Sequence, residues 1–296
     1  MKNTVFEGAA TAIITPLFED GSVDYESFGR LIDFQISSGI DAIVVAGTTG
    51  EGSTLTDEEH RDVMKYCVDR VAHRVPVIAG TGSNDTAYAI ELTKAACEMG
   101  ADAMLLVTPY YNKATQNGLI ASFAKIADES DKPCILYNVP SRTGCNLTPA
   151  SVKALASHPN IVGVKEASGN ISQIAEIAAL CGDGFDLYSG NDDQIVPIMS
   201  LGGKGVISVL SNLLPGETSR MCHLCLEGNY REAARMQLEY LPLINALFCE
   251  VNPIPAKAAM AAMGYGANAL RLPLTPIEEA HGAALLAEMR KAGINV

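Results

Sequence analysis

The chain has 296 residues, of which 48% are hydrophobic and 19% are charged, and its formal net charge at pH 7 is −13. This composition is typical of a globular protein and excludes a disordered or fibrous chain. The acidic charge repels nucleic-acid phosphates and acidic membrane surfaces, and no local cluster of lysine and arginine offsets it. We therefore expect small-molecule ligands, with neither a nucleic acid nor a membrane as partner.

The N-terminus shows neither a signal peptide nor a membrane-spanning apolar run, which predicts a cytoplasmic protein. The eight cysteines lie in apolar segments, and we expect buried thiols rather than disulfides. Cys222 and Cys225 form a CxxC pair in a segment with a helical pattern. A zinc site needs about four ligands, and no second cysteine pair or suitably spaced histidine pair accompanies them. The sequence thus predicts no metal and leaves the role of this pair open.

Eight short apolar segments follow one another along the first part of the chain, and amphipathic stretches separate them. A glycine that ends a helix precedes three of them, in SGIDAIVVAG, MGADAMLLVTP and LGGKGVISVLS. Continuous apolar strands that alternate with helices are typical of a parallel sheet covered on both faces. The predicted strands are residues 9–15, 41–46, 75–80, 102–108, 133–138, 161–165, 185–189 and 205–210.

The amphipathic stretches predict helices between these strands. In one of them Thr56 and Glu59 form a capping box, and apolar residues then recur every four positions. Eight alternating strands and helices favour an α/β fold of the (β/α)8 TIM-barrel type over an open sheet, because no glycine-rich dinucleotide motif follows the first strand. We place a catalytic barrel at residues 1–225 and a C-terminal helical region at residues 226–296.

Polar groups gather where the predicted strands end, which is the active-site face of such a barrel. Lys165, in the segment IVGVKEASGN, ends a strand that has no solvated face. Because burial disfavours the charged form of an amine, we expect this lysine to be neutral and nucleophilic. Such an amine forms a Schiff base with a ketone, which then serves as an electron sink for carbon–carbon bond formation. The other polar groups at these strand ends are Thr48, Thr49, Tyr110, Tyr111, Tyr137, Arg142 and Ser208.

Alternation along a strand places Ile161, Gly163 and Lys165 on one face, and Tyr137 on the corresponding face of the preceding strand. If that face lines the barrel, the amine and the phenol meet. A phenol relayed through a threonine hydroxyl can then move the protons that each step needs. We expect Gly163 to leave room for the lysine stem, and we expect Glu166 to point outward without a chemical role.

Each of these residues also has a simpler interpretation. A single lysine at a strand end is usually a surface residue whose ammonium group reaches water. Tyrosines at strand ends usually pack with their hydroxyl bonded to the backbone. The loop GTTGEG lacks the ending of a phosphate-binding P-loop. The coincidence of such groups at five strand ends nevertheless favours a catalytic site.

The segments GTTGE, PYYN, YNVPSRTG, GVKEASGN and SGND resemble, in order and spacing, those of the dihydrodipicolinate synthases, a family of pyruvate-dependent class I aldolases. The similarity extends over essentially the whole chain. GxTGE and KEASG are shared with sugar-acid aldolases such as N-acetylneuraminate lyase, whereas SRTG distinguishes the family. The resemblance implies a lyase that condenses pyruvate with L-aspartate 4-semialdehyde in the diaminopimelate pathway to lysine, without a cofactor.

The resemblance also implies roles for individual residues. Lys165 would form the Schiff base with pyruvate. Tyr137, Thr48 and Tyr111 would form a proton relay, with Tyr111 reaching into the site of a neighbouring subunit in a homotetramer of two tight dimers. The residues implied in substrate binding are Thr49 for the carboxylate of pyruvate, Arg142 for that of the semialdehyde, and the backbones of Gly190 and Ile207.

The family's feedback site for lysine is matched only in part. His60, Asn84 and Tyr110 fit its pattern, but Tyr88 stands where lysine-sensitive relatives have a carboxylate, and Asp57 where many have histidine. A carboxylate is the expected partner of the inhibitor's ammonium group. We therefore predict weak inhibition by lysine or none.

Three other functions stay open on the sequence alone. A sugar-acid aldolase would use the same chemistry but should have a less basic and more hydroxyl-rich pocket than Arg142 indicates. A non-catalytic ligand-binding barrel would lack a relay residue, yet all of them are present. A phosphate-binding isomerase is disfavoured because Asn191, Asp192 and Asp193 would face the anion.

Overall fold

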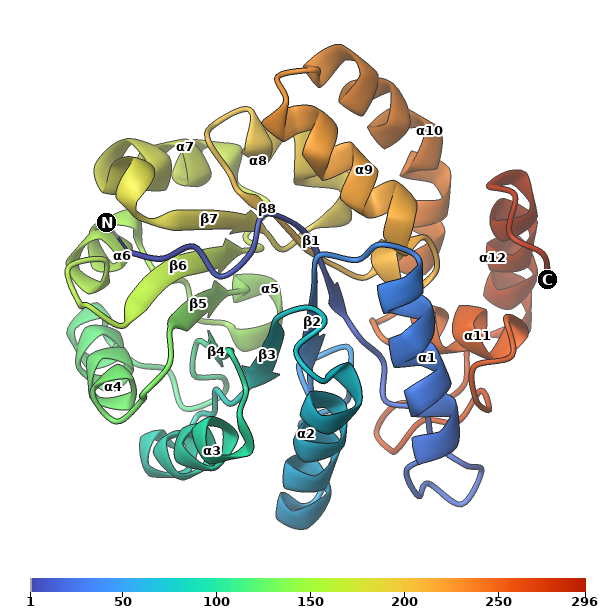
Figure 1. The fold of residues 1–296 in the computed structure, drawn as a ribbon, viewed down its shortest axis with the longest axis horizontal. Helices are drawn as coiled ribbons and strands as arrows, with labels where there is room; N and C mark the ends of the chain where they lie inside the picture. Colours follow the sequence, from blue (N-terminus) through green and yellow to red (C-terminus); the bar gives the residue numbers. More distant parts are fainter. Residues whose placement is uncertain (1) are drawn as a thin grey trace.

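The computed structural model describes residues 2–296, and its strands form a closed parallel barrel in the order β1 to β8 (Figure 1). Every predicted strand is present, displaced at its ends by a few residues at most. The TIM barrel predicted from the alternating pattern is therefore confirmed. The strands are β1 (Gly8–Ala12), β2 (Ala42–Val45), β3 (Val77–Gly80), β4 (Ala103–Val107), β5 (Cys134–Asn138), β6 (Ile161–Glu166), β7 (Asp186–Ser189) and β8 (Gly205–Ser208).

Helices surround the strands, and several begin at a side chain that accepts a hydrogen bond from the first turn. The predicted capping box of Thr56 and Glu59 is present at the start of α2. The helices are α1 (Tyr25–Ser37), α2 (Asp57–Val71), α3 (Thr86–Met99), α4 (Gln116–Asp128), α5 (Pro140–Thr143), α6 (Pro149–Leu155), α7 (Ile171–Cys181), α8 (Ile195–Met199), α9 (Pro215–Leu226), α10 (Tyr230–Leu247), α11 (Ile254–Ala262) and α12 (Glu279–Lys291), with short 3-10 turns η1 (Gly182–Gly184), η2 (Asp192–Gln194) and η3 (Leu210–Asn212).

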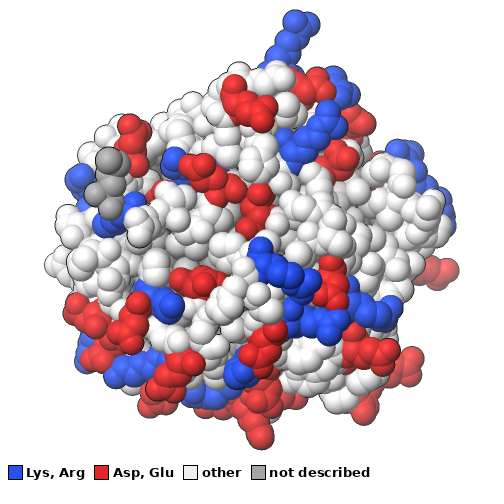
Figure 2. All heavy atoms as spheres, in the orientation of Figure 1, with Lys and Arg blue, Asp and Glu red and all other residues white. Residues whose placement is uncertain are grey.

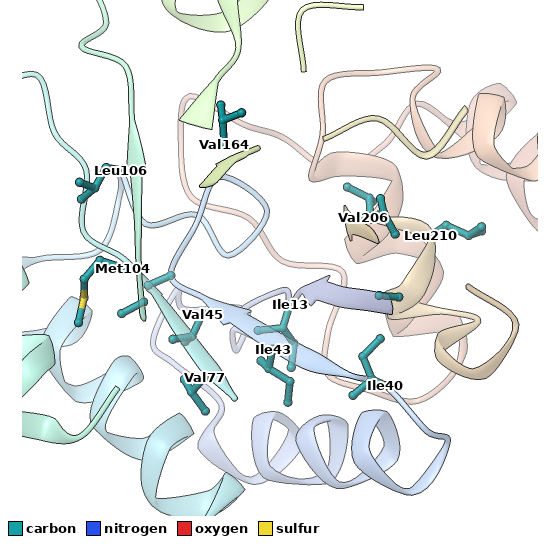
Figure 3. Close-up of a cluster of buried hydrophobic side chains, with 14 of the residues drawn as sticks. Ile13, Ile40, Ile43, Val45, Val77, Met104, Leu106, Val164, Val206 and Leu210 are labelled. Carbon is teal, nitrogen blue, oxygen red and sulfur yellow. The ribbon is translucent and has the colours of Figure 1, made fainter. Parts of the chain in front are cut away.

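Two layers of apolar side chains lie on the two sides of the strands. In β2, Ala42 and Val44 belong to the inner layer, which fills the barrel. Ile43 and Val45 belong to the outer layer between strands and helices, part of which Figure 3 shows. Because both faces of each strand are covered, the strands are apolar at most positions, which explains the apolar runs in the sequence.

One strand departs from strict alternation. β5 and β6 pair Cys134 with Ile161 and then Ile135 with Gly163, so β6 carries an additional residue, Val162, between the two pairs. The irregularity turns Ile161 into the outer layer and Val162 into the inner layer. The prediction that Ile161 shares a face with Lys165 is therefore wrong, because it assumed an unbroken period of two.

The C-terminal helices gather on one side of the barrel, with α10 packed on α8 and α9, and α12 packed on α10 and α11 (Figure 1). A buried ion pair ties α11 to the loop after β2: the Lys257 ammonium group contacts the Glu51 carboxylate, and the two side chains are 0% and 3% exposed. The main-chain N of Arg271 also donates to Glu51, at 3.1 Å. The predicted boundary at residue 225 falls in the last turn of α9, and the division into two domains stays a prediction.

Charged side chains of both signs are intermixed on the face shown in Figure 2. Within residues 2–296, no helix combines the length and the apolar character needed to cross a membrane.

The cysteines are free thiols. Cys222 and Cys225 are buried in α9, and burial raises the pKa of both thiols, that of Cys225 to about 11. The prediction of buried thiols is confirmed for this pair and for Cys67, Cys134 and Cys145, whereas Cys97 and Cys181 are only half-buried. It is wrong for Cys249, which is exposed in the connection after α10, beyond the end of the helix.

Candidate active site

Lys165 lies at the carboxyl end of β6, where its register partner on β5 is Tyr137. Its Nζ atom lies 4.2 Å from the centroid of the Tyr137 ring, and the residue is 6% exposed. Tyr137 itself belongs to the inner layer of the barrel. The predicted meeting of amine and phenol inside the barrel is therefore confirmed.

The pKa of Lys165 is lowered to about 7. Burial is the main cause, because the protein replaces the water that would solvate an ammonium group. The negative charge of Asp192 opposes the shift, and the positive charge of Arg142 adds to it. A large fraction of the amine is therefore neutral near pH 7, which is the form that attacks a carbonyl carbon.

Gly190, directly after β7, makes the room for the lysine stem. A Cβ atom at Gly190 would lie 3.1 Å from Cε of Lys165 and 2.6 Å from Cβ of Ala167. At Gly163, a Cβ atom would instead meet the main-chain oxygen of Asp186 at 2.5 Å. Gly163 thus allows β6 and β7 to approach closely. The expectation that Gly163 makes room for the lysine stem is wrong, because the space next to Gly163 borders Asp186 at the start of β7.

Tyr137 and Thr48 are the relay residues that one chain brings together. Burial raises the pKa of Tyr137, while the charge of Arg142 and a side-chain hydrogen bond with Thr48 act in the opposite direction. Thr48 lies in the loop after β2, where Ala46 and Glu51 have left-handed φ angles of 54° and 55°. These two residues turn the loop sharply. Thr48 lies between them and lines the same cavities as Tyr137.

A cavity of about 170 Å³ opens beside Lys165, and its walls include Thr48, Thr49, Tyr137 and Arg142. A second cavity of about 380 Å³ shares Thr48, Tyr137 and Arg142 with the first. The walls of the smaller cavity combine the Lys165 amine, the Arg142 guanidinium group and the hydroxyls of Thr48, Thr49, Tyr137 and Ser141. This set suits small acids that carry a carbonyl group.

Three of the residues expected to bind substrate, Thr49, Arg142 and Gly190, line the smaller cavity. The fourth, Ile207, is buried in the inner layer on β8. Arg142 lies on the single turn of α5 rather than in an open loop, because Pro140 starts a helix there. Its Nη2 donates to the main-chain oxygen of Asn252 at 3.1 Å, which holds the guanidinium group at the cavity.

Tyr111 is not brought to the cavity within one chain. It lies between β4 and α4, it is 91% exposed, and its φ angle is 72°. A bulky residue in this left-handed conformation is uncommon. The side chain that the resemblance assigns to the relay therefore projects from the surface.

The residues of the expected feedback site lie together. His60, Tyr88 and Tyr110 line the larger cavity, and Nδ2 of Asn84 donates to the main-chain oxygen of Tyr110 at 3.3 Å. Burial lowers the pKa of His60. Burial and a hydrogen bond with Asp57 raise the pKa of Tyr88 to about 12, so this phenol stays uncharged at neutral pH.

Glu166 points away from the barrel as expected, but it is fully buried. Its carboxylate accepts hydrogen bonds from Nδ2 of Asn138 at 3.0 Å and from the main-chain N of Ser168 at 2.8 Å. Asn138 and Glu166 directly follow Tyr137 and Lys165 and are register partners. Their hydrogen bond therefore holds the two strand ends that carry the phenol and the amine.

Sequence reasoning gave no role in the site to two buried residues, Asp192, whose charge acts on Lys165, and Asn252, which lines the smaller cavity. Asp192 is 2% exposed, and its Oδ2 accepts from the main-chain N atoms of Val209 and Leu210 at 3.0 and 2.9 Å. Its position in SGND, at a strand end, was a usable signal. Asn252 lies in the segment VNPIPAK, and nothing in the local pattern of that segment indicates that it reaches the barrel.

Outside this site, one group of metal-ligating atoms occurs among the residues that the structure describes, formed by Glu250, Glu278 and His281. Nδ1 of His281 lies 2.7 Å from Oε1 of Glu250, which also accepts from the main-chain N of Glu278 at 2.9 Å. The hydrogen bonds of His281 and of the first turn of α12 to Glu250 account for this arrangement.

Known proteins resemble the chain along its whole length. Residues 5–292 match the model of the family described as the dihydrodipicolinate synthetase family. A curated relative from Lachnoclostridium phytofermentans, named 4-hydroxy-tetrahydrodipicolinate synthase, is 55% identical over 98% of this chain and 99% of its own.

Two solved structures are similar in both sequence and fold. The chloride-inhibited dihydrodipicolinate synthase from Acinetobacter baumannii, complexed with pyruvate, is 43% identical, with a TM-score of 0.97 over 99% of this chain and 100% of that one. The enzyme from Cyanidioschyzon merolae with lysine bound is also 43% identical, with a TM-score of 0.96 over 99% and 100% of the two chains. With its barrel, its buried lysine and these matches, the chain belongs to the dihydrodipicolinate synthetase family.

Proposed function

We propose that the chain joins pyruvate to L-aspartate 4-semialdehyde through a Schiff base on Lys165 and yields 4-hydroxy-tetrahydrodipicolinate. The observation that carries this proposal is the buried Lys165 amine, which meets Tyr137 beside a small cavity lined by hydroxyls and Arg142. Support comes from the curated relatives named for this synthase and from the A. baumannii enzyme, whose structure holds pyruvate.

In the first step, the neutral Lys165 amine attacks the ketone carbon of pyruvate. The nitrogen loses protons, the former ketone oxygen gains them and leaves as water, and an imine remains. Tyr137 holds its phenolic proton at neutral pH because its pKa is raised, so it can deliver that proton to the departing oxygen. Thr48, whose side chain acts on the pKa of the phenol, then returns a proton to Tyr137.

In the second step, the protonated imine withdraws electrons and the methyl carbon of pyruvate loses a proton, which gives an enamine. The enamine carbon attacks the aldehyde carbon of the semialdehyde, and the aldehyde oxygen takes up a proton. The amino group of the semialdehyde then attacks the imine carbon, closes the ring and releases Lys165 as the free amine. The bonds formed and broken balance without an external oxidant or reductant.

The two substrate carboxylates need separate donors. Thr49, with the backbones of Gly190 and Ile207, would hold the carboxylate of pyruvate near Lys165. Arg142 would hold that of the semialdehyde, because a guanidinium group pairs with a carboxylate through two hydrogen bonds and this one lines both cavities.

In the same proposal, Tyr111 completes the relay from a neighbouring subunit. Its exposure of 91% supports this, since a phenol that projects from the surface can enter a second chain's cavity. A cytoplasmic homotetramer built from two tight dimers is the assembly that we propose.

Pyruvate followed by borohydride will attach a three-carbon adduct to Lys165 and abolish activity, because reduction turns the reversible imine into a stable secondary amine. Intact-protein and peptide mass spectrometry will detect and locate the adduct. The Lys165→Arg variant, which keeps a cation but lacks a nucleophilic amine, should keep its mass under the same treatment. An unchanged mass of the folded unmodified protein would refute the mechanism.

Arg142→Ala will lower kcat/KM for the semialdehyde by about tenfold to a hundredfold, the loss expected when a charged hydrogen-bonding partner is removed. Its effect on pyruvate adduct formation should be only a small change, caused by the altered charge near Lys165. Steady-state kinetics and borohydride trapping measure the two effects. Arg231→Ala, at an exposed position on α10, is the control. Equal losses in both steps would contradict the assigned role.

L-lysine will inhibit the enzyme weakly or not at all, because Tyr88 is uncharged at neutral pH and offers no negative charge to the ammonium group. An ammonium group buried without a charged partner loses roughly a hundredfold in affinity. Calorimetry should show tighter lysine binding to Tyr88→Glu than to the unmodified protein. Tyr88→Phe, which removes the hydroxyl without adding charge, should not tighten it. Strong inhibition of the unmodified enzyme by micromolar lysine would disprove the prediction.

A further inference from the structure

The connection between α10 and α11 reaches the mouth of the barrel, and Phe248 and Asn252 from it line the smaller cavity. The buried pair of Glu51 and Lys257 fixes α11 directly behind this connection. Glu51 belongs to the same loop as Thr49, so the ion pair also fixes the connection relative to that loop. A segment remote from the barrel in sequence thereby becomes a wall of the active site.

Asn252 contacts two residues to which the proposed function assigns a substrate. Its Nδ2 donates to Oγ1 of Thr49 at 2.9 Å, and its main-chain oxygen accepts from Nη2 of Arg142 at 3.1 Å. Asn252 is 5% exposed, and its Oδ1 has no hydrogen-bond partner among the described residues. One buried residue therefore meets the donors for both carboxylates, the first through its side chain and the second through its backbone.

The side-chain contact determines what the Thr49 hydroxyl can do. A threonine hydroxyl donates one hydrogen bond and accepts up to two. Since the Asn252 amide occupies an acceptor position on Oγ1, the hydroxyl proton is free to point into the cavity that Thr49 lines. The amide also polarises the hydroxyl, which strengthens it as a donor. A carboxylate only accepts hydrogen bonds, so this orientation favours its binding.

We propose that Asn252 is a positioning residue for pyruvate: its side chain sets Thr49 as a hydrogen-bond donor to the pyruvate carboxylate. The main-chain contact with Arg142 serves the second substrate separately. The inference rests on the proposed function and deepens it, because it makes recognition of pyruvate depend on the C-terminal region. Asn252 acts through Thr49 and does not touch the reacting atoms.

Asn252→Asp tests the proposal, because aspartate has the same shape but cannot donate. It would accept the Thr49 proton and place a negative charge beside the substrate carboxylate. The pyruvate concentration that gives half-maximal borohydride-trapped adduct should rise about tenfold or more. The KM for the semialdehyde should stay within about threefold, since the main-chain oxygen that holds Arg142 is retained. Asn252→Ala should give a smaller rise, because Thr49 is then unoriented rather than opposed.

Two controls separate positioning from general damage. Asn245→Asp introduces the same change at an exposed position on α10 and should leave adduct formation unchanged. In a double-mutant cycle with Thr49→Val, adding Asn252→Asp should cause little further loss, because the residue through which it acts is already gone. Thermal unfolding identifies variants that fail to fold, and if Asn252→Asp fails, the cycle is carried out with Asn252→Ala.

The outcomes distinguish a failure of the proposed function from a failure of the role assigned to Asn252. Absence of an adduct in the unmodified protein would overturn the proposed function and this inference with it. A normal adduct in the unmodified protein with unchanged half-saturation in both Asn252 variants would overturn the inference alone. So would full additivity with Thr49→Val, because Asn252 would then act independently of Thr49.

Discussion

The removal of one amine from water is the constraint on which the rest of the site depends. A solvated lysine is charged and unreactive at neutral pH, whereas Lys165, enclosed by the barrel, has a pKa of about 7. The barrel provides this burial because both faces of its strands are covered and its interior is filled with apolar side chains. Gly190 gives the stem its space, and the hydrogen bond between Asn138 and Glu166 holds the strand ends in register.

The charges around the amine are balanced rather than neutralised by a single partner. Asp192 favours the ammonium form of Lys165 and Arg142 favours the neutral form. Burial therefore remains the main cause of the lowered pKa. A direct ion pair favours the ammonium form, as at Lys257, where contact with Glu51 opposes the lowering of the pKa by burial. The protein thus contains two buried lysines with different surroundings, one paired and structural, the other unpaired and available for reaction.

The sequence predicted the features that follow from local pattern. Apolar runs between amphipathic stretches gave the barrel, and alternation brought Lys165 and Tyr137 to one interior. It could not show the irregularity at Val162, because a bulge leaves no mark in an apolar strand, and Ile161 was therefore placed on the wrong face. The space around Lys165 depends on how neighbouring strands approach, so the sequence pointed to Gly163 and gave no sign that Gly190 makes this room. Asn252 lies far along the chain, and only the packing of α11 brings it to Thr49.

The most direct test of the central claim is the pKa of the Lys165 amine itself. Lysine labelled with ¹³C at Cε can be titrated by NMR in the folded, unmodified protein, and the Lys165→Arg variant identifies the signal. We expect a midpoint of about 7 for Lys165. Below that pH the amine is protonated and pyruvate adduct formation should slow, and above it the rate should level off. A midpoint near the value of about 10.4 for a solvated lysine would contradict the account, because the amine would then be charged when it has to react.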